Sequence, residues 1–84
     1  MSASTESYLT YIGAIRSLSP RTVEAYRDDL RLYEASCLLS GCTTETATPA
    51  EARAFIAGLV RSGYATSSVN RALSAVKGYY RYLI

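Results

Sequence analysis

The sequence predicts an all-α fold of four helices in one small domain, and three observations support this prediction. Apolar residues recur at steps of three and four in four separate stretches, which is typical of amphipathic helices. No stretch alternates apolar and polar residues for long enough to predict a strand. Two prolines and five glycines in 84 residues leave few turns. A chain of this length buries about 60–65% of its unfolded surface, which indicates a modest core.

The first two predicted helices are separated by the stretch SLSPRT. The first covers about residues 5–16, and its apolar stripe contains Tyr8, Leu9, Ile12 and Ile15. Ser19 suits the N-cap of the second helix because its hydroxyl can accept from a free backbone N–H, and Pro20 suits the first helical position. The second helix is expected to end near residue 39, before Gly41. Its buried stripe is expected to contain Val23, Tyr26, Leu30, Tyr33 and Cys37.

The third and fourth predicted helices follow the polar connector CTTETAT. Thr48 and Glu51 are spaced as a capping box at the start of the third helix. The residues expected to point inward from it are Ala52, Phe55, Ile56, Leu59 and Val60. Gly63 is expected in a left-handed conformation after it, and Thr66 or Ser67 is the expected cap of the fourth helix. The fourth helix runs to the end of the chain with the apolar stripe Val69, Leu73, Val76, Tyr80 and Leu83.

The charges are distributed unevenly along the chain. Nine Lys and Arg residues against seven Asp and Glu give a net charge of +2, which alone says little about a partner. All the acids precede residue 52, whereas residues 53–84 contain five basic residues and no acid. A segment with one sign of charge favours an anionic partner, and a solvated basic face is the alternative. No signal peptide or membrane-spanning run is recognised, so we expect a cytoplasmic protein without a membrane partner.

The sequence offers little chemistry for catalysis or for a metal. Without histidine, most metal sites and the Ser-His-Asp and Cys-His sites lack a central member. No phosphate loop or dinucleotide fingerprint is present, so no cofactor is expected. Cys37 and Cys42 cannot form a zinc site alone, and free thiols are expected, with a disulfide between them as the alternative. Asp28 and Asp29 are adjacent, so on a helix they do not face one another. We therefore expect no catalytic residue and no metal site in this chain.

Eight of the nine aromatic residues are tyrosines. Tyr26, Tyr33 and Tyr80 lie on apolar stripes and are expected to pack in the core with their hydroxyls at its edge. Tyr79 and Tyr82 flank the stripe of the last helix and could instead cover a neighbouring element. None has a general base nearby in the sequence, so none is interpreted as a nucleophile.

Two predicted helix starts combine free backbone N–H groups with polar or basic side chains, a combination suited to phosphate. One is the start of the second helix, with Ser19, Arg21 and Thr22. The other is the fourth helix, which begins with Thr66, Ser67 and Ser68 and continues its polar face with Asn70, Arg71, Ser74 and Lys77. Asn can pair with adenine and Arg with guanine in the major groove, whereas Lys and Ser suit phosphates. Plain capping is the alternative at the second helix, and a solvated face is the alternative at the fourth.

Two strings resemble a known family. LSPRTVEAYRDDL resembles a helix of tyrosine recombinases in which Leu-Ser-Pro-x-Thr is followed by Tyr and then by Asp-Leu. GYATSSVNRALSAVKGYYRYL resembles the last helix of their core-binding domain, with Asn-Arg, Leu-Ser-Ala, a basic residue and an aromatic pair. Together the strings make residues 5–84 similar to the N-terminal core-binding (SAM-like) domain of Xer-type recombinases and phage integrases. The resemblance implies a four-helix orthogonal bundle.

The resemblance also implies a function. Family members clamp double-stranded DNA between two domains, and the second and fourth helices of the core-binding domain meet the major groove and its phosphates. Carried onto this sequence, the implied DNA-binding residues are Arg21, Thr22, Arg27, Ser67, Ser68, Asn70, Arg71, Ser74 and Lys77. Arg27 and Arg31 are weaker candidates because Glu24 and Glu34 can pair with them along the helix. The family's catalytic residues, which break and rejoin DNA through a phosphotyrosyl intermediate, belong to another domain.

We therefore expect residues 1–84 to form one core-binding domain of a longer recombinase, because the last helix ends within its apolar pattern; a native C-terminus that frays is the alternative. Other recombinase protomers are implied partners. The first helix offers Tyr8, Tyr11 and Ile12 for such contacts, although core packing is favoured for them. The low net charge predicts weak, salt-sensitive DNA binding. The rivals are a helical protein-interaction module without DNA affinity and a helix-turn-helix regulator, and both chromosome-dimer resolution and integration of mobile DNA stay open.

Overall fold

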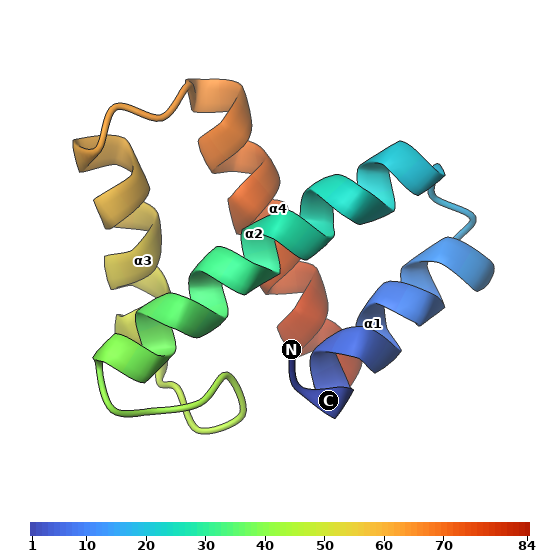
Figure 1. Cartoon of the computed structure of the whole chain (residues 1–84), viewed down its shortest axis with the longest axis horizontal. Helices are drawn as coiled ribbons and strands as arrows, with labels where there is room; N and C mark the ends of the chain where they lie inside the picture. Colours follow the sequence, from blue (N-terminus) through green and yellow to red (C-terminus); the bar gives the residue numbers. More distant parts are fainter.

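A computed structural model describes all of residues 1–84 and contains four helices and no strand (Figure 1). The helices are α1 (Ala3–Ala14), α2 (Pro20–Leu39), α3 (Pro49–Arg61) and α4 (Thr66–Leu83). The all-α prediction is confirmed, and the arrangement is consistent with the SAM-like bundle that the resemblance implies. None of the four helices combines the length and the apolar composition that a membrane span requires.

The helices are arranged around α4, which packs on each of the other three. α2 crosses α4 steeply, while α1 and α3 lie on opposite sides of that crossing (Figure 1). The long α2 therefore bridges the molecule and contacts α1 near one end and α3 near the other. This leaves the first turns of α2 and α4 at the periphery, where a partner can reach them.

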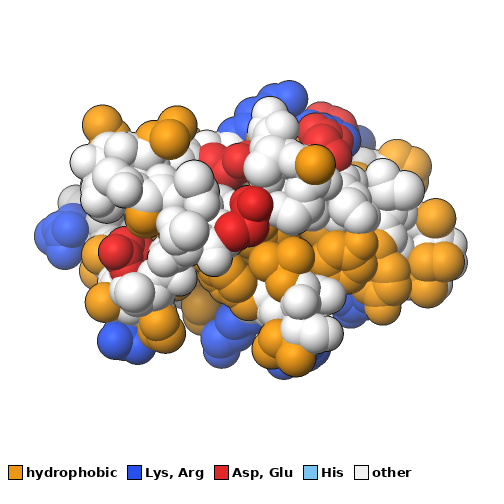
Figure 2. Space-filling view, turned by 90° about the horizontal axis from the view of Figure 1, so that it is seen from below, with side chains coloured by type: hydrophobic (Ala, Val, Ile, Leu, Met, Phe, Trp, Pro, Cys, Tyr) orange, Lys and Arg blue, Asp and Glu red, His pale blue; other side chains and the backbone are white.

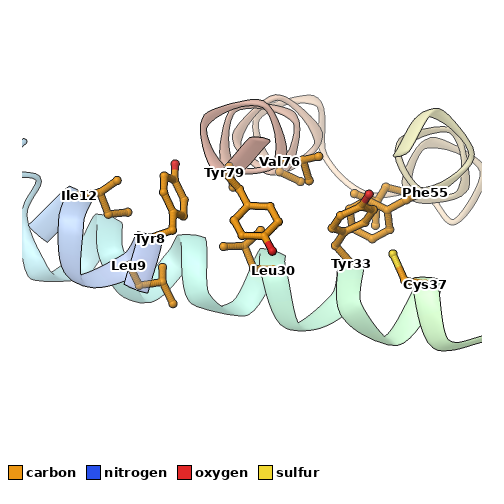
Figure 3. Close-up of a cluster of buried hydrophobic side chains, with 12 residues drawn as sticks. Tyr8, Leu9, Ile12, Leu30, Tyr33, Cys37, Phe55, Val76 and Tyr79 are labelled. Atoms are coloured by element: carbon orange, nitrogen blue, oxygen red, sulfur yellow. The ribbon is translucent and has the colours of Figure 1, made fainter. Parts of the chain in front are cut away.

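The core is one continuous cluster of twelve buried side chains that follows α2 from α1 to α3 (Figure 3). Tyrosines form much of it. The rings of Tyr8 and Tyr79 lie 5.9 Å apart in an edge-to-face arrangement, and those of Tyr33 and Phe55 lie 5.2 Å apart. Close aromatic pairs of this kind add to the stabilisation that comes from area burial alone. Tyr79, which was expected to flank the apolar stripe of the last helix, is fully buried in this core.

Three of the four helix starts have the side-chain caps that the polar residues before them allow. Ser2 accepts from the backbone N–H of Thr5 at the start of α1, and Ser19 caps α2 as predicted. At α3, the Glu51 carboxylate accepts from the backbone N–H of Thr48 at 2.9 Å, so the predicted capping box is present. The Thr48 hydroxyl also donates to the Glu51 carboxylate. This bond is the largest cause of the lowered pKa of Glu51, and the backbone N–H of Thr48 is the next.

The predicted cap of α4 and the predicted bounds of α1 are wrong. Ala65 is the N-cap of α4, so Thr66 and Ser67 lie inside the helix and no side chain caps it. α1 begins two residues earlier than predicted, because Ser2 supplies its cap, and it ends at Ala14. The predicted left-handed conformations are present at Gly63, with φ of 84°, and at Gly41, with φ of 79°.

Some predicted inward positions are also wrong. Ile15 is 71% exposed because it follows the last residue of α1, and Val60 is 60% exposed because α2 and α4 cover only the neighbouring Phe55–Leu59 side of α3. On α4 the buried residues are Ala72, Ala75, Val76 and Tyr79. Of the predicted stripe, Val76 is therefore buried as expected, Val69, Leu73 and Tyr80 are half-buried, and Leu83 is exposed. Ala72 and Ala75 are at most 1% exposed and Leu83 is 41% exposed, so the buried face of α4 is turned away from Leu83.

The two cysteines carry free thiols. Cys37 is buried at the end of α2, and burial raises the pKa of its thiol to about 11. The Cys42 thiol donates to the carbonyl oxygen of Cys37, and the backbone N–H of Cys42 bonds to the same oxygen at 2.9 Å. Cys37 therefore packs as a small hydrophobic residue that also helps to end α2.

Candidate nucleic-acid interface

The exposed side of α4 carries a polar stripe at helical spacing. Ser67, Asn70, Ser74 and Lys77 are all exposed and follow one another at steps of three and four residues. Residues at this spacing share one face of a helix. Arg81 continues the stripe toward the end of α4, and the helix contains no acidic residue. The surface therefore combines an amide, hydroxyls and two positive charges with no carboxylate of its own helix among them.

The start of α4 lies at one end of this stripe. The first intrahelical bond donated at this end runs from Val69 to the carbonyl of Ala65, so the preceding N–H groups have no partner within the helix. No side chain caps them, and the first turn contains no acid. Unpaired N–H groups and the helix dipole make such an end attractive to a phosphate oxygen. Ser68 is half-buried beside it, whereas Ser67 is exposed.

Arg71 is held by a residue that sequence reasoning had set aside. Its Nε donates to Oδ2 of Asp29 at 2.8 Å, and its Nη2 donates to Oδ1 at 2.9 Å. Asp29 is only 4% exposed, so the pair joins α2 to α4 where they cross. The hydrogen bond to Asp29 raises the pKa of Arg71. Two guanidinium nitrogens of Arg71 therefore already donate to Asp29 and are not free to pair with a guanine, although 42% of the side chain stays exposed.

A signal for the role of Asp29 is present in the sequence. Asp29 stands three residues after Tyr26 and four before Tyr33, which places it on the apolar stripe of α2. An acid on a buried stripe requires a cationic or hydrogen-bonding partner, because burial of an unpaired charge is costly. The partner lies 42 residues away, so the sequence could indicate that one was needed but not which one.

Two of the three arginines of α2, Arg27 and Arg31, form ion pairs. Arg27 donates to Glu6 of α1 at 2.8 Å and to Glu24 at 3.2 Å, and the bond to Glu6 is the main cause of its raised pKa. The predicted pairing with Glu24 is thus confirmed. Arg31 pairs with Asp28 at 3.6 Å, so the predicted pairing of Arg31 with Glu34 is wrong.

Glu34 instead accepts from the backbone N–H of Ser2, because α1 begins beside this part of α2. The middle of α2 therefore carries little uncompensated positive charge.

The start of α2 divides its two predicted contact residues. Arg21 is exposed and forms no ion pair. The backbone N–H of Thr22 bonds to the Ser19 hydroxyl at 3.2 Å, and the two hydroxyls lie 2.9 Å apart. Thr22 therefore serves the cap, which was the alternative interpretation, and Arg21 is the side chain that is free to meet an anion.

Figure 1 places the first turns of α2 and α4 in the upper part of the view, on different sides of the helix crossing. The predicted contact residues at the two helix starts therefore form two separate groups. Arg71 lies between α2 and α4, where they cross.

The tyrosine hydroxyls mostly serve the core. Burial raises the pKa of Tyr8, Tyr33 and Tyr80, which favours the neutral phenol. The Tyr33 and Tyr80 hydroxyls lie 2.6 Å apart, and Tyr80 donates to the Thr44 carbonyl at 2.7 Å, which ties the α2–α3 connection to α4. Tyr8 and Ile12 are buried, as the favoured core interpretation predicted, and only Tyr11 among the three α1 candidates keeps an accessible side.

Comparison with known proteins identifies relatives of this chain. The family model described as "Phage integrase, N-terminal SAM-like domain" matches residues 5–84. The tyrosine recombinase XerC of Azotobacter vinelandii is 35% identical over 85 residues, which cover 100% of this chain and 28% of that protein. The XerC of Treponema denticola is 32% identical over 79 residues, which cover 94% of this chain and 26% of that protein.

The tyrosine recombinase XerD of Chlorobaculum tepidum is 33% identical over 79 residues, which cover 94% of this chain and 26% of that protein. The chain thus spans about a quarter of the length of the curated relatives it matches. No solved structure was found to match it.

Proposed function

The chain belongs to the phage integrase family, as its N-terminal SAM-like domain, and from this premise we propose that it binds double-stranded DNA. The observation that carries the proposal is the exposed, acid-free stripe of α4. Ser67, Asn70 and Ser74 supply hydrogen-bonding groups there, and Lys77 supplies a positive charge. An α-helix fits the major groove, where an amide side chain can pair with the edge of an adenine.

The individual roles follow from what each side chain is free to do. Asn70 is the residue proposed to read a base. Ser67, Ser68, Ser74 and Lys77 are proposed to contact phosphates around it, together with the unpaired N–H groups at the start of α4. Arg21 is proposed to contact a phosphate from the start of α2, beside Thr22.

Arg27 and Arg71 belong to a second group, because both already hold carboxylates. Asp29 accepts from Nε and Nη2 of Arg71, while Nη1 forms no hydrogen bond and 42% of the side chain is exposed. A phosphate contact is therefore compatible with the ion pair, and a bidentate guanine contact is not. Arg27 is 24% exposed and bonded to two glutamates, so it is the weakest of the proposed contacts.

The activity of the longer protein is also part of the proposal. Relatives that span about four times this length are named tyrosine recombinases. We propose that this chain positions such an enzyme on its recombination site, among other protomers, while residues outside this chain break and rejoin the DNA. The few free cations near α4 indicate weak binding by this domain alone.

The test is the salt dependence of DNA binding, measured by fluorescence anisotropy of a short labelled duplex of mixed sequence. About three to five phosphate contacts would give a log–log slope of about −3 to −4.5 between about 50 and about 200 mM salt. Lys77→Ala should reduce the magnitude of the slope by about one, because one phosphate contact is lost. Asn70→Ala should weaken binding without changing the slope.

Arg61→Ala is the matched control, because Arg61 is an exposed, unpaired cation that lies on α3 and outside the proposed contacts. It should leave the slope within error of the unchanged chain. A flat salt response, or an equal effect of Lys77→Ala and Arg61→Ala, would contradict the proposal.

A further inference from the structure

An open groove of about 810 Å³ lies between α3 and α4. The two helices diverge from the loop that joins them, so the groove opens where their other ends separate (Figure 1). Its apolar lining comes mainly from the two helices and includes Ala52, Ile56, Leu73, Val76 and Tyr80, together with Ile84 directly after α4. A volume of this size is within the range of functional binding sites, which is about 300–1,000 Å³.

The cations around this groove are unpaired. Arg53 of α3 and Lys77 and Arg81 of α4 line it, and all three are exposed without an ion pair. No acidic residue lines it. In this respect the groove differs from α2, where Arg27 and Arg31 are compensated by neighbouring carboxylates.

Figure 2 shows the same separation of charges on the face it views. Hydrophobic side chains gather in the centre and right of this face, and Lys and Arg lie along its lower edge without Asp or Glu. Asp and Glu lie in its middle and upper parts, where further Lys and Arg are also seen.

We propose that the groove binds an acidic amphipathic helix of another polypeptide. Its apolar side chains, spaced at i, i+3, i+4 and i+7, would lie on the apolar floor, as in other helix-in-groove complexes. Its Asp and Glu residues would face Arg53, Lys77 and Arg81, which gives the contact its charge complementarity. Duplex DNA has the right charge but no apolar side chains to cover the floor, so this surface is distinct from the α4 stripe except for Lys77 and Arg81.

Binding of a labelled synthetic peptide to the 84-residue chain tests this inference. The probe is a helix-forming peptide with Leu at the four spaced positions and Glu on both flanks, and its control carries Lys in place of every Glu. We expect the acidic peptide to bind at least about tenfold more tightly than the basic one, with an affinity that falls as salt increases. Amide shifts in the NMR spectrum should concentrate at Ala52, Ile56 and Tyr80.

Two variants should weaken peptide binding for different reasons. Ala57→Trp fills it from an exposed position of α3, and Arg53→Ala removes one of its cations. Both should weaken peptide binding about tenfold or more, whereas Arg61→Ala, a matched loss of an exposed arginine from the same helix, should not. Circular dichroism of each variant verifies that the four helices are intact.

The DNA proposal and this one fail separately. Asn70→Ala should reduce DNA binding and spare the peptide, whereas Arg53→Ala should do the reverse. Equal binding of the acidic and basic peptides would overturn the inference. So would concentration-dependent dimers in sedimentation experiments that Ala57→Trp abolishes, because the occupant would then be a second copy of this chain.

Discussion

The two sides of α4 are packed in different ways. Toward α1 the residues Tyr8, Leu9 and Ile12 are at most 2% exposed, and the Tyr8 ring meets the rings of Tyr79 and Tyr82 at 5.9 and 5.6 Å. Toward α3 the residues Phe55 and Leu59 keep 7% and 8% of their surface exposed, and an open groove lies beside them. Side-chain size accounts for the difference, because alanines line α3 where tyrosines fill the contact with α1.

This difference teaches that amphipathic patterning and close packing are separate properties. Both α1 and α3 present an apolar face to α4, yet only the α1 side fills the space between the helices. Interiors packed to crystal-like density lose much stability when one side chain is shortened, whereas the half-buried wall of an open groove loses less. The α1 side therefore stabilises the domain, and the α3 side is available to a partner.

The largest expected effect comes from shortening one side chain on each side of α4. Tyr79→Ala should lower the free energy of unfolding by about 3–5 kcal/mol, because it removes a fully buried ring. It also deprives the Ser4 and Thr44 hydroxyls of a partner at 2.8 Å. Ile56→Ala, in the half-buried groove wall, should cost about 1 kcal/mol. Urea unfolding followed by circular dichroism measures both, and equal losses would contradict the comparison.

Two glycines provide a matched pair of smaller effects with opposite signs. A Cβ at Gly78 would press into the buried hydroxyl of Tyr8, whereas at Gly58 its nearest neighbour is Nη2 of Arg61 at 3.9 Å. Gly78→Ala should therefore destabilise by about 1–3 kcal/mol despite the better helix propensity of alanine. Gly58→Ala should stabilise by about 0.5–1 kcal/mol. Thermal unfolding distinguishes them, and a gain in both variants would show that the α1 side is not closed.

The smallest expected effect concerns pH and the start of α3, which an exposed capping box holds. The pKa of Glu51 is lower in the folded chain than in the unfolded one, so its stabilisation is present above about pH 4.3 and is lost as the pH falls through the folded value. Glu51→Gln should lower the melting temperature slightly at pH 7, and this gap should narrow toward pH 3. A gap that stays constant with pH would show that the charge of Glu51 contributes nothing.

Local features of the molecule could be predicted because their causes lie within a few residues of one another. Apolar spacing identified the four helices, Ser19 and the Thr48–Glu51 pair identified two helix starts, and Gly41 and Gly63 identified two helix ends. The predicted cap of α4, Thr66 or Ser67, is one or two residues late, because both are good capping residues by type while the extended N-cap conformation lies at Ala65. Residue type alone does not decide which of several adjacent candidates caps a helix.

The sequence could predict which side chains belong to the candidate site, but not which of them are free of partners within the chain. The polar residues of α4 form the expected exposed stripe, because a face without apolar residues does not enter a core. The engagement of Arg71 by Asp29, of Arg27 by Glu6 and of Thr22 by its cap could not be ranked in advance. Both ion pairs join different helices: Arg71 and Asp29 are 42 residues apart in the sequence, and Arg27 and Glu6 are 21 apart.

The sequence by itself determined the helices, most of their ends and the sign of the charge on α4, because these depend on neighbours within one or two turns. Only the tertiary structure decided which face of α4 is buried, which arginines are free and where an apolar groove stays open. The physical reason is that these properties depend on how closely two helices approach. That distance is set by the sizes of side chains, such as Ala72 and Tyr79, which meet partners far away in the chain.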